Sequence, residues 1–300
     1  MKSNIKNNAY FVSSLKISIA VLVGAISLPH GVGQAIHEIG FETSQNYTTT
    51  GGGNLSGQGG DGGSLPNWST GGSTELKIVT SSSGTTTLLP PEGNQMLQGQ
   101  YGTGSTTGLQ NFLTPENAIK ESFNFSFKLA VNAESVGNAA FSMYVSGQQA
   151  NNGFYIGLSR FGTGTELDPY VYGFIARQSL PGQTSFYTRL GTDTFSLNEF
   201  HTFDLTLDWD TLTFGGTVSN AGGVVTTFSD VAIWNRDGNV HDNGFSRLGF
   251  QINQIGNSPY FLIDDIRISQ IPEPSALVMT LLGAGAVFYW RRRSPGLFSS

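Results

Sequence analysis

Two stretches of the chain alternate between apolar and polar residues, and this pattern constrains the fold more than any other feature. In "FNFSFKLAV" (123–131) phenylalanine, leucine and valine share one parity, and mostly polar residues share the other. In "HTFDLTLDW" (201–209) phenylalanine, leucine and tryptophan alternate with threonine and aspartate. Alternation with a period of two over eight or more residues predicts a β-strand that buries one face and exposes the other to solvent.

Shorter alternating runs recur along 75–270, separated by turn-forming segments such as "LPGQ", "SNAGG" and "NRDGN". Roughly ten to thirteen strands without an amphipathic helix predict antiparallel sheets, and two such sheets packed face to face form an all-β antiparallel β-sandwich. No linker interrupts 75–270, so we expect one domain. It would include 36–74, where a first strand precedes a glycine-rich loop or arm anchored by Trp68.

The first 35 residues have the layout of a secretory signal peptide. Lysines precede an apolar run, Ile17–Leu28, and small residues lead to Ala35. The run is shorter than the about 20 residues of a membrane span, although an N-terminal anchor helix is the alternative. We therefore predict a signal helix, cleavage after Ala35 and export. The sequence contains no cysteine, so an exported fold would depend on its core or on a metal rather than on disulfides.

A Pro-Glu-Pro triplet, an uncharged run and a basic cluster follow one another in 271–293, before a tail at 294–300. They are Pro272, Glu273 and Pro274, then Ala276–Trp290, then Arg291, Arg292 and Arg293. As a helix the uncharged run would rise about 22 Å, which is short of a bilayer core of about 30 Å. We predict a short hydrophobic helix that inserts transiently into the inner membrane with its arginines on the cytoplasmic side. A plain single-span anchor is the alternative.

This order of triplet, helix and arginines resembles the PEP-CTERM sorting domain, apart from the additional "SPGLFSS" after the arginines. The resemblance implies processing by an exosortase, a membrane-embedded enzyme similar to cysteine transpeptidases. It also implies delivery to the cell envelope, outer surface or extracellular matrix of a Gram-negative bacterium that makes exopolysaccharide.

The body resembles concanavalin A-like jelly-roll domains in their laminin-G-like and carbohydrate-binding versions. The resemblance rests on "NEFHTFDLTLDWDTLTFGGTVSN", on "FLIDDIRIS" as a closing strand and on "IGFET" as a first strand. In the resembled modules a structural calcium ion lies between the first and last strands. The matching positions are Glu42 and either Asp264 or Asp265, with main-chain carbonyls completing the shell.

Asp264 is also notable without the resemblance. It shares its parity with Ile266 and Ile268, so alternation places its carboxylate on the apolar side of the last strand. An isolated buried charge costs several kcal/mol, and the carboxylate therefore needs a partner. Calcium, a hydrogen-bonded carboxylate without metal, and simple exposure are the three alternatives.

Net charge and motifs exclude several function classes. Residues 36–270 hold nine of the fifteen basic and twenty of the twenty-one acidic residues, a net charge of −11. Such a body argues against nucleic acid or anionic membrane as its partner. The sequence contains neither a Walker loop nor the G-x-S-x-G and H-E-x-x-H motifs.

Glycosidase chemistry needs two carboxylates about 5–10 Å apart. The nearest string, "DLTLDWD", places Asp204, Asp208 and Asp210 on the polar parity but offers no glutamate acid. A solvated strand face explains these residues better than a nucleophile and an acid. We predict a protein without catalytic residues.

Four tyrosines are candidates for stacking on sugar rings. Parity directs Tyr144 and Tyr155 outward, and "PYVYGF" adds Tyr170 and Tyr172. Cross-strand pairing on a sheet face is the alternative role. The sequence thus predicts an exported, exosortase-sorted surface or matrix protein with a non-catalytic sandwich that contacts exopolysaccharide. A glycan-active hydrolase or lyase and a purely structural or adhesive matrix protein are the alternatives.

Overall fold

The computed structural model divides the chain into Met1–Val32 and Gly33–Ser300, and every residue it describes belongs to the second unit. The described residues are 35–50, 53–60, 66–71, 76–83, 86–99, 106–132, 138–147, 152–160, 172–179, 182, 186–255 and 260–271. The segments expected to form the signal helix and the C-terminal helix lie outside these residues. Among the described residues, no helix has the length and apolar character needed to cross a bilayer.

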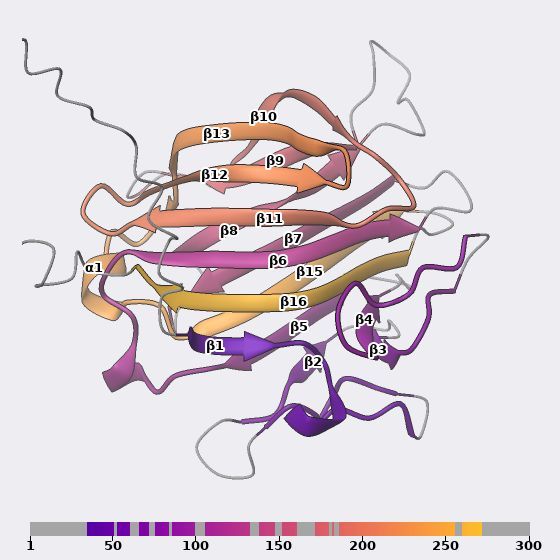
Figure 1. Ribbon diagram of the computed structural model, residues 1–300. Coiled ribbons are helices and arrows are strands. Elements are labelled where there is room, and N and C mark those ends of the chain that lie inside the picture. The colour runs from indigo at the N-terminus through magenta and orange to yellow at the C-terminus, as the bar shows by residue number, and fades with distance from the viewer. Residues whose placement is uncertain are drawn as a thin grey trace, which may run out of the picture. The chain divides into compact units, whose positions relative to one another are not determined.

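Sheet A contains eight strands, and all its pairings are antiparallel (Figure 1). Its order is β13 (Gly223–Ala232), β12 (Thr213–Asn220), β11 (His201–Asp208), β6 (Phe123–Asn132), β16 (Tyr260–Gln270), β4 (Met96–Gly99) and β3 (Leu76–Val79). The eighth strand, β1 (Ala35–Ile39), pairs with the second half of β16, beyond the residues that pair with β4.

Sheet B also contains eight strands and lies behind sheet A in Figure 1, with its strands crossing those of sheet A obliquely. Its order is β10 (Phe186–Phe195), β9 (Tyr172–Gln178), β8 (Asn152–Arg160), β7 (Asn138–Ser146), β15 (Arg247–Ile255), β5 (Thr106–Asn111) and β2 (Ser69–Gly71). The short β14 (Trp234–Asn235) pairs with β8. The helical elements among the described residues are α1 (Val240–Asn243) and two 3-10 turns, Thr43–Gln45 and Pro115–Asn117.

Phenylalanine rings join the two sheets. Phe154 of β8 lies edge-on to Phe125 of β6, with ring centroids 5.6 Å apart, and to Phe214 of β12 at 4.3 Å. Phe141 of β7 stacks on Phe261 of β16. Alternation on β6 and β11 places their apolar residues in this core, as their parity predicts. The predicted all-β antiparallel sandwich is therefore confirmed.

The parity predicted for β16 is wrong at Asp264, because a β-bulge follows it. Asp264 pairs with Lys128 of β6 and Arg267 pairs with Ser126, so two residues of β16 stand opposite one residue of β6. Asp265 has a φ of 48°, the left-handed conformation that such a bulge uses. The bulge returns Ile266 to the core and leaves Asp264 on the outer side of sheet A.

The connection between β3 and β4 covers this outer side. Its Leu88 packs against a second apolar cluster made of Met96, Ala130 and Leu262. The buried Asn132 of β6 donates through Nδ2 to the Ser82 hydroxyl, at 2.9 Å. Asp264 and Asn132 are thus buried although both lie outside the sandwich core.

The first strand is shorter than expected, and the described glycine-rich residues pack on the sandwich. β1 ends at Ile39, so Glu42 follows the strand instead of lying within it. In the described parts of 36–74, Leu55 and Trp68 are buried in the main core. The indole Nε1 of Trp68 donates to the Tyr47 hydroxyl, 2.8 Å away. These described residues therefore pack on the sandwich, and Trp68 anchors them.

Candidate functional site

Aromatic side chains gather on the outer side of sheet B. Met143 and Val145 point into the core, which directs Tyr144 of β7 outward. Tyr155 of β8 stands directly opposite Tyr144, and their rings stack with centroids 4.8 Å apart. The outward orientation of both tyrosines, predicted from parity, is confirmed, and so is their cross-strand pairing. Their role in binding a ligand stays a prediction.

Gly249 of β15 lets the Tyr144 ring lie close to the sheet. The two residues pair across β7 and β15, and a Cβ on Gly249 would lie 2.3 Å from Cζ of Tyr144. Real Cβ contacts do not reach that distance, so any larger residue would displace the ring. A glycine at this position therefore fixes the height of the Tyr144 ring over the sheet.

Arg177 of β9 lies among three aromatic rings. Its Cζ is 3.4 Å from the ring centroid of Trp234, 5.5 Å from Tyr155 and 5.8 Å from Tyr187. A guanidinium over an aromatic face gains electrostatic energy from the ring quadrupole. Tyr187 of β10 pairs with Arg177 and is 52% exposed, whereas Tyr155 is only 6% exposed. Tyr187 is therefore the ring of this group that solvent reaches most.

We call Tyr144, Tyr155, Arg177, Tyr187 and Trp234 the aromatic–arginine cluster. Its members come from β7, β8, β9, β10 and β14. From β7 to β10 there are three strand spacings of about 4.8 Å, or about 14 Å in all. The cluster thus forms a row across the strands, long enough for an extended ligand.

Two hydrogen-bond donors beside the row lack partners. Ser179 forms a bridge with Trp234, and both side chains are buried. Within the described part of the chain, neither the Ser179 hydroxyl nor the Trp234 Nε1 has a hydrogen-bond partner. A buried donor without a partner costs about 1–3 kcal/mol, so water or a ligand oxygen would stabilise this end of the row.

Sequence reasoning found only part of the cluster. Tyr170 lies outside the described residues, and Tyr172 is the first residue of β9. Arg177, Tyr187 and Trp234 were missed because they come from separate strands and no spacing in the sequence brings them together. Strand parity could have identified part of the cluster, because it places four residues on one side of neighbouring strands: Ile175, Arg177, Tyr187 and Arg189.

A second group of charges lies where β16 bulges on sheet A. Lys128 forms ion pairs with Glu92 and with Asp265, the latter at 3.2 Å. Asp264 is fully buried beside them, and its Oδ1 accepts from the Asp265 backbone N–H at 2.9 Å. Burial raises the pKa of Asp264 to about 7. Burial and the nearby Asp265 charge also raise the pKa of Asp204.

The predicted calcium ligands do not come together as a metal site in these contacts. Oε1 of Glu42 accepts the backbone N–H groups of Asn94 and Gln95, at 2.7 and 2.9 Å. Among the described residues, no three carboxylate, histidine or cysteine side chains form a group that could hold a metal ion. Calcium at Glu42, Asp264 and Asp265 therefore stays a prediction.

The carboxylates of "DLTLDWD" take part in local structure. Oδ1 of Asp208 accepts the backbone N–H groups of Asp210 and Thr211 in the turn after β11, at 2.9 and 3.2 Å. These hydrogen bonds hold the pKa of Asp208 below its usual value. Asp204 projects from the outer side of the strand. The contacts of Asp208 are those of a turn-capping residue.

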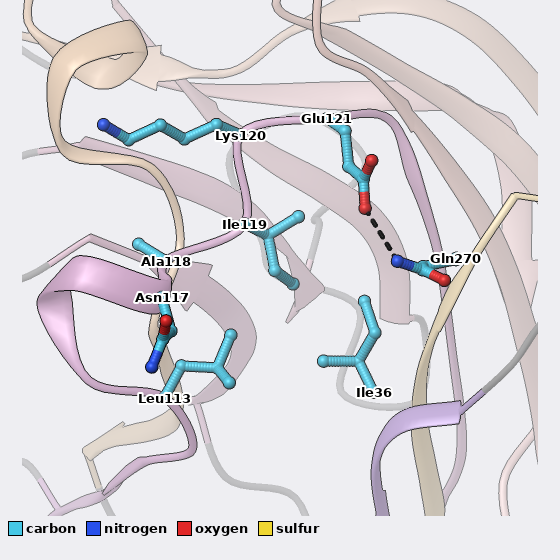
Figure 2. Close-up of a pocket in the computed structure, with 8 residues that line it drawn as sticks. All are labelled: Ile36, Leu113, Asn117, Ala118, Ile119, Lys120, Glu121 and Gln270. Atoms are coloured by element: carbon cyan, nitrogen blue, oxygen red, sulfur yellow. Dashed lines mark hydrogen bonds between the residues drawn. The ribbon is translucent and has the colours of Figure 1, made fainter.

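A pocket of about 340 Å³ lies beside the end of β16 (Figure 2). It is lined by Ile36, Leu113, Asn117, Ala118, Ile119, Lys120, Glu121 and Gln270. Glu121 points toward Gln270, whose Nε2 donates to its Oε1 at 3.0 Å. With one carboxylate already hydrogen-bonded, this lining does not offer the pair of carboxylates that sugar hydrolysis needs.

The comparisons with known proteins concern the body and the C-terminus separately. No curated protein sequence matches the chain. Among solved structures, a botulinum neurotoxin type C, whose cell entry depends on interaction with two ganglioside molecules, is 13% identical. The match covers 84% of this chain and 51% of that chain, with a TM-score of 0.44. The chain thus spans about half the length of the neurotoxin.

A carbohydrate esterase from the Shiga toxin-encoding bacteriophage phi24B is 16% identical, over 80% of this chain and 100% of that chain, with a TM-score of 0.43. The binding domain of botulinum neurotoxin serotype G is 9% identical, over 82% and 50%, with a TM-score of 0.38. Likeness at this level carries no argument about function.

The C-terminus gives a specific match, as its resemblance predicts. The matched range begins at Gln270, the last residue of β16 and part of the pocket lining. It includes the Pro-Glu-Pro triplet and the three arginines, which lie outside the described residues. This motif indicates export and sorting to the cell envelope, and it implies processing by an exosortase. Residues 270–293 of this chain thus match the PEP-CTERM protein-sorting motif.

Proposed function

We propose that this protein is an exosortase-processed component of the outer surface or extracellular matrix of a Gram-negative bacterium. Its sandwich contacts exopolysaccharide through the outer side of sheet B and catalyses no reaction on it. The sorting motif supports delivery to the envelope. The aromatic–arginine cluster is the observation that carries the contact with polysaccharide.

Three features of the cluster suit a sugar polymer. The exposed Tyr187 ring offers a flat apolar surface, on which the C–H groups of a pyranose can pack. Arg177 lies next to that ring and supplies N–H donors that match sugar oxygens. The row crosses five strands, so successive sugars of one chain could contact it. Each contact is weak, and a polymer that makes several at once gains affinity from their number.

Processing is tested by intact-mass analysis of the protein recovered from the cell surface. We expect a mature form that has lost both ends, near Ala35 and within 272–276, because a signal peptidase and an exosortase would each remove one segment. A mature form that still carries Arg291–Arg293 would contradict the role of the sorting motif.

Contact with polysaccharide is tested by affinity electrophoresis of the whole chain, purified in mild detergent, through gels that contain the exopolysaccharide of the host. We expect the wild-type chain to be retarded and Tyr187→Ala to weaken binding about two- to twelvefold, since one aromatic contact contributes about 0.5–1.5 kcal/mol. Val224→Ala is the matched control. Val224 is an apolar residue of β13 in sheet A and is 67% exposed, so its loss should leave retardation unchanged.

Two outcomes would contradict the proposal. Migration without retardation in every polysaccharide would leave a purely structural role. Release of reducing ends that stops in the Asp208→Asn variant would show a hydrolase.

A further inference from the structure

The charged residues of the strands are divided unequally between the two sheets. The strands of sheet B that the structure describes contain four arginines and one aspartate, a net charge of +3. The strands of sheet A contain three basic and six acidic residues, a net charge of −3. The body as a whole is strongly acidic, so the basic character of sheet B is not a consequence of overall composition.

Three of the four arginines project from the outer side of sheet B, where the aromatic–arginine cluster lies. Leu190 and Leu248 point into the core, so their neighbours Arg189 and Arg247 point outward, as Arg177 does. Arg189 lies two residues beyond Tyr187 on β10, and Arg247 lies two residues before Gly249 on β15. Arg177 therefore lies in the row itself, whereas Arg247 and Arg189 flank its β15 and β10 ends, two residues to either side of it. Nε of Arg247 also donates to Oδ1 of Asn111, at 2.9 Å.

We propose that sheet B binds a polysaccharide whose sugars carry carboxylate groups, such as a polyuronate. The inference rests on the proposed function and specifies its ligand. Guanidinium groups bind carboxylates through two parallel hydrogen bonds, and such charge-assisted bonds are about twice as strong as neutral ones. Arg189 on β10 and Arg247 on β15 are four strand spacings apart, about 19 Å, and arginines spread this far match charges repeated along a polymer better than those of a small anion.

The negative charge of the rest of the body does not prevent this binding at physiological salt. The two sheets of a sandwich are about 10 Å apart, and Asp204 and Asp208 of sheet A project from the far side, where Asp264 also lies. The Debye length is about 8 Å at physiological ionic strength, so these charges are largely screened at the outer side of sheet B. The aromatic rings also favour a sugar polymer over other polyanions, because only a polymer with apolar sugar faces contacts both the rings and the arginines.

The test compares one polymer in two states of charge. The affinity of the whole chain in mild detergent is measured for polygalacturonate and for the same polymer after its carboxyl groups have been reduced to alcohols. We expect the reduced polymer to bind at least about tenfold more weakly, and Arg189→Gln and Arg247→Gln each to weaken polygalacturonate binding about tenfold. Arg189→Lys should recover only part of the loss, because an ammonium group cannot form the bidentate pair.

Arg267→Gln is the matched control. It removes the same unit of charge from β16 on sheet A, and we expect unchanged affinity. If Arg267→Gln weakens binding as much as Arg189→Gln, the effect is one of net charge and the site assignment is wrong.

Two further outcomes would overturn the inference. Equal affinity for the charged and reduced polymers would disprove recognition of carboxylates while leaving the proposed polysaccharide contact intact. Equally tight binding of double-stranded DNA and polygalacturonate would show unspecific attraction of polyanions. Binding to neither polymer, together with no retardation by the host polysaccharide, would instead remove the proposed function itself.

Discussion

Sheets A and B share one core but differ on their outer sides. On sheet A, the connection between β3 and β4 covers part of the surface and buries Asp264 and Asn132. On sheet B, the outer side carries stacked rings around Arg177 and leaves Tyr187 half-exposed. The outer side of sheet A contributes to holding the fold together, whereas in the proposed function that of sheet B binds the ligand.

The largest expected effect concerns the core that the sheets share. Phe154 contacts rings of both β6 and β12, so Phe154→Ala leaves a cavity between the sheets and should cost about 3–5 kcal/mol. For a domain of this size the melting temperature should fall by about 6–20 °C. Tyr187→Ala, on the exposed side of sheet B, should change the free energy of unfolding by less than about 0.5 kcal/mol. Thermal unfolding followed by circular dichroism measures both, and a large loss in Tyr187→Ala would break the division of roles.

A smaller effect concerns only sheet A and depends on pH. The pKa of Asp264 is about 7 when the protein is folded, against about 3.9 when it is unfolded, so the folded state binds this proton more tightly. The contribution of Asp264 to wild-type stability should therefore be greatest at low pH and fall as the pH rises from about 4 to 7. Asp264→Asn removes this dependence and should be more stable than wild type at pH 8, by up to about 4 kcal/mol.

Denaturant unfolding of both forms at pH 4, 6 and 8 measures the difference, and contributions from other titrating groups cancel in it. Parallel pH profiles would show that Asp264 does not titrate as its burial requires. Polygalacturonate binding should be unchanged in Asp264→Asn, because Asp264 and the arginines of the row belong to different sheets.

Chelation distinguishes between a bound proton and a bound calcium ion as the partner of the Asp264 carboxylate. With a proton as the partner, we expect EDTA to leave the wild-type melting temperature unchanged. Calcium at a hundredfold excess over its Kd would stabilise the fold by about 2.7 kcal/mol. EDTA would then lower the melting temperature of the wild type by about 5–10 °C and leave that of Asp264→Asn unchanged.

The fold could be predicted from the sequence because the signal that specifies it is local. Side chains on a strand alternate, so Phe125 and Leu205 reveal the buried faces of β6 and β11 without knowledge of any neighbour. Tyr144 and Tyr155 could be directed outward in the same way. Alternation fails at Asp264, because a bulge adds one residue and reverses the parity of everything before it.

The site depends on strand order, which alternation does not reveal. Arg177 meets Trp234 because β14 pairs with β8, next to β9, although the two residues are far apart in sequence. Sheet order also determines the division of charge, since the sum for each sheet needs every strand to be assigned. Composition gives only the net charge of the whole body, which is acidic and does not reveal the basic outer side of sheet B.

The position of β16 has a consequence for how the chain can fold. It is the last strand that the structure describes, yet it lies inside sheet A, where Ile268 pairs with His37 on one side and Phe125 on the other. Until β16 emerges, no described strand of sheet A links β1 and the β3–β4 pair to β6, β11, β12 and β13. Contacts between residues so distant in sequence form slowly. A chain that emerges N-terminus first can therefore complete sheet A only after β16, which directly precedes the sorting motif, has emerged. Completion of the fold and emergence of the sorting motif therefore coincide.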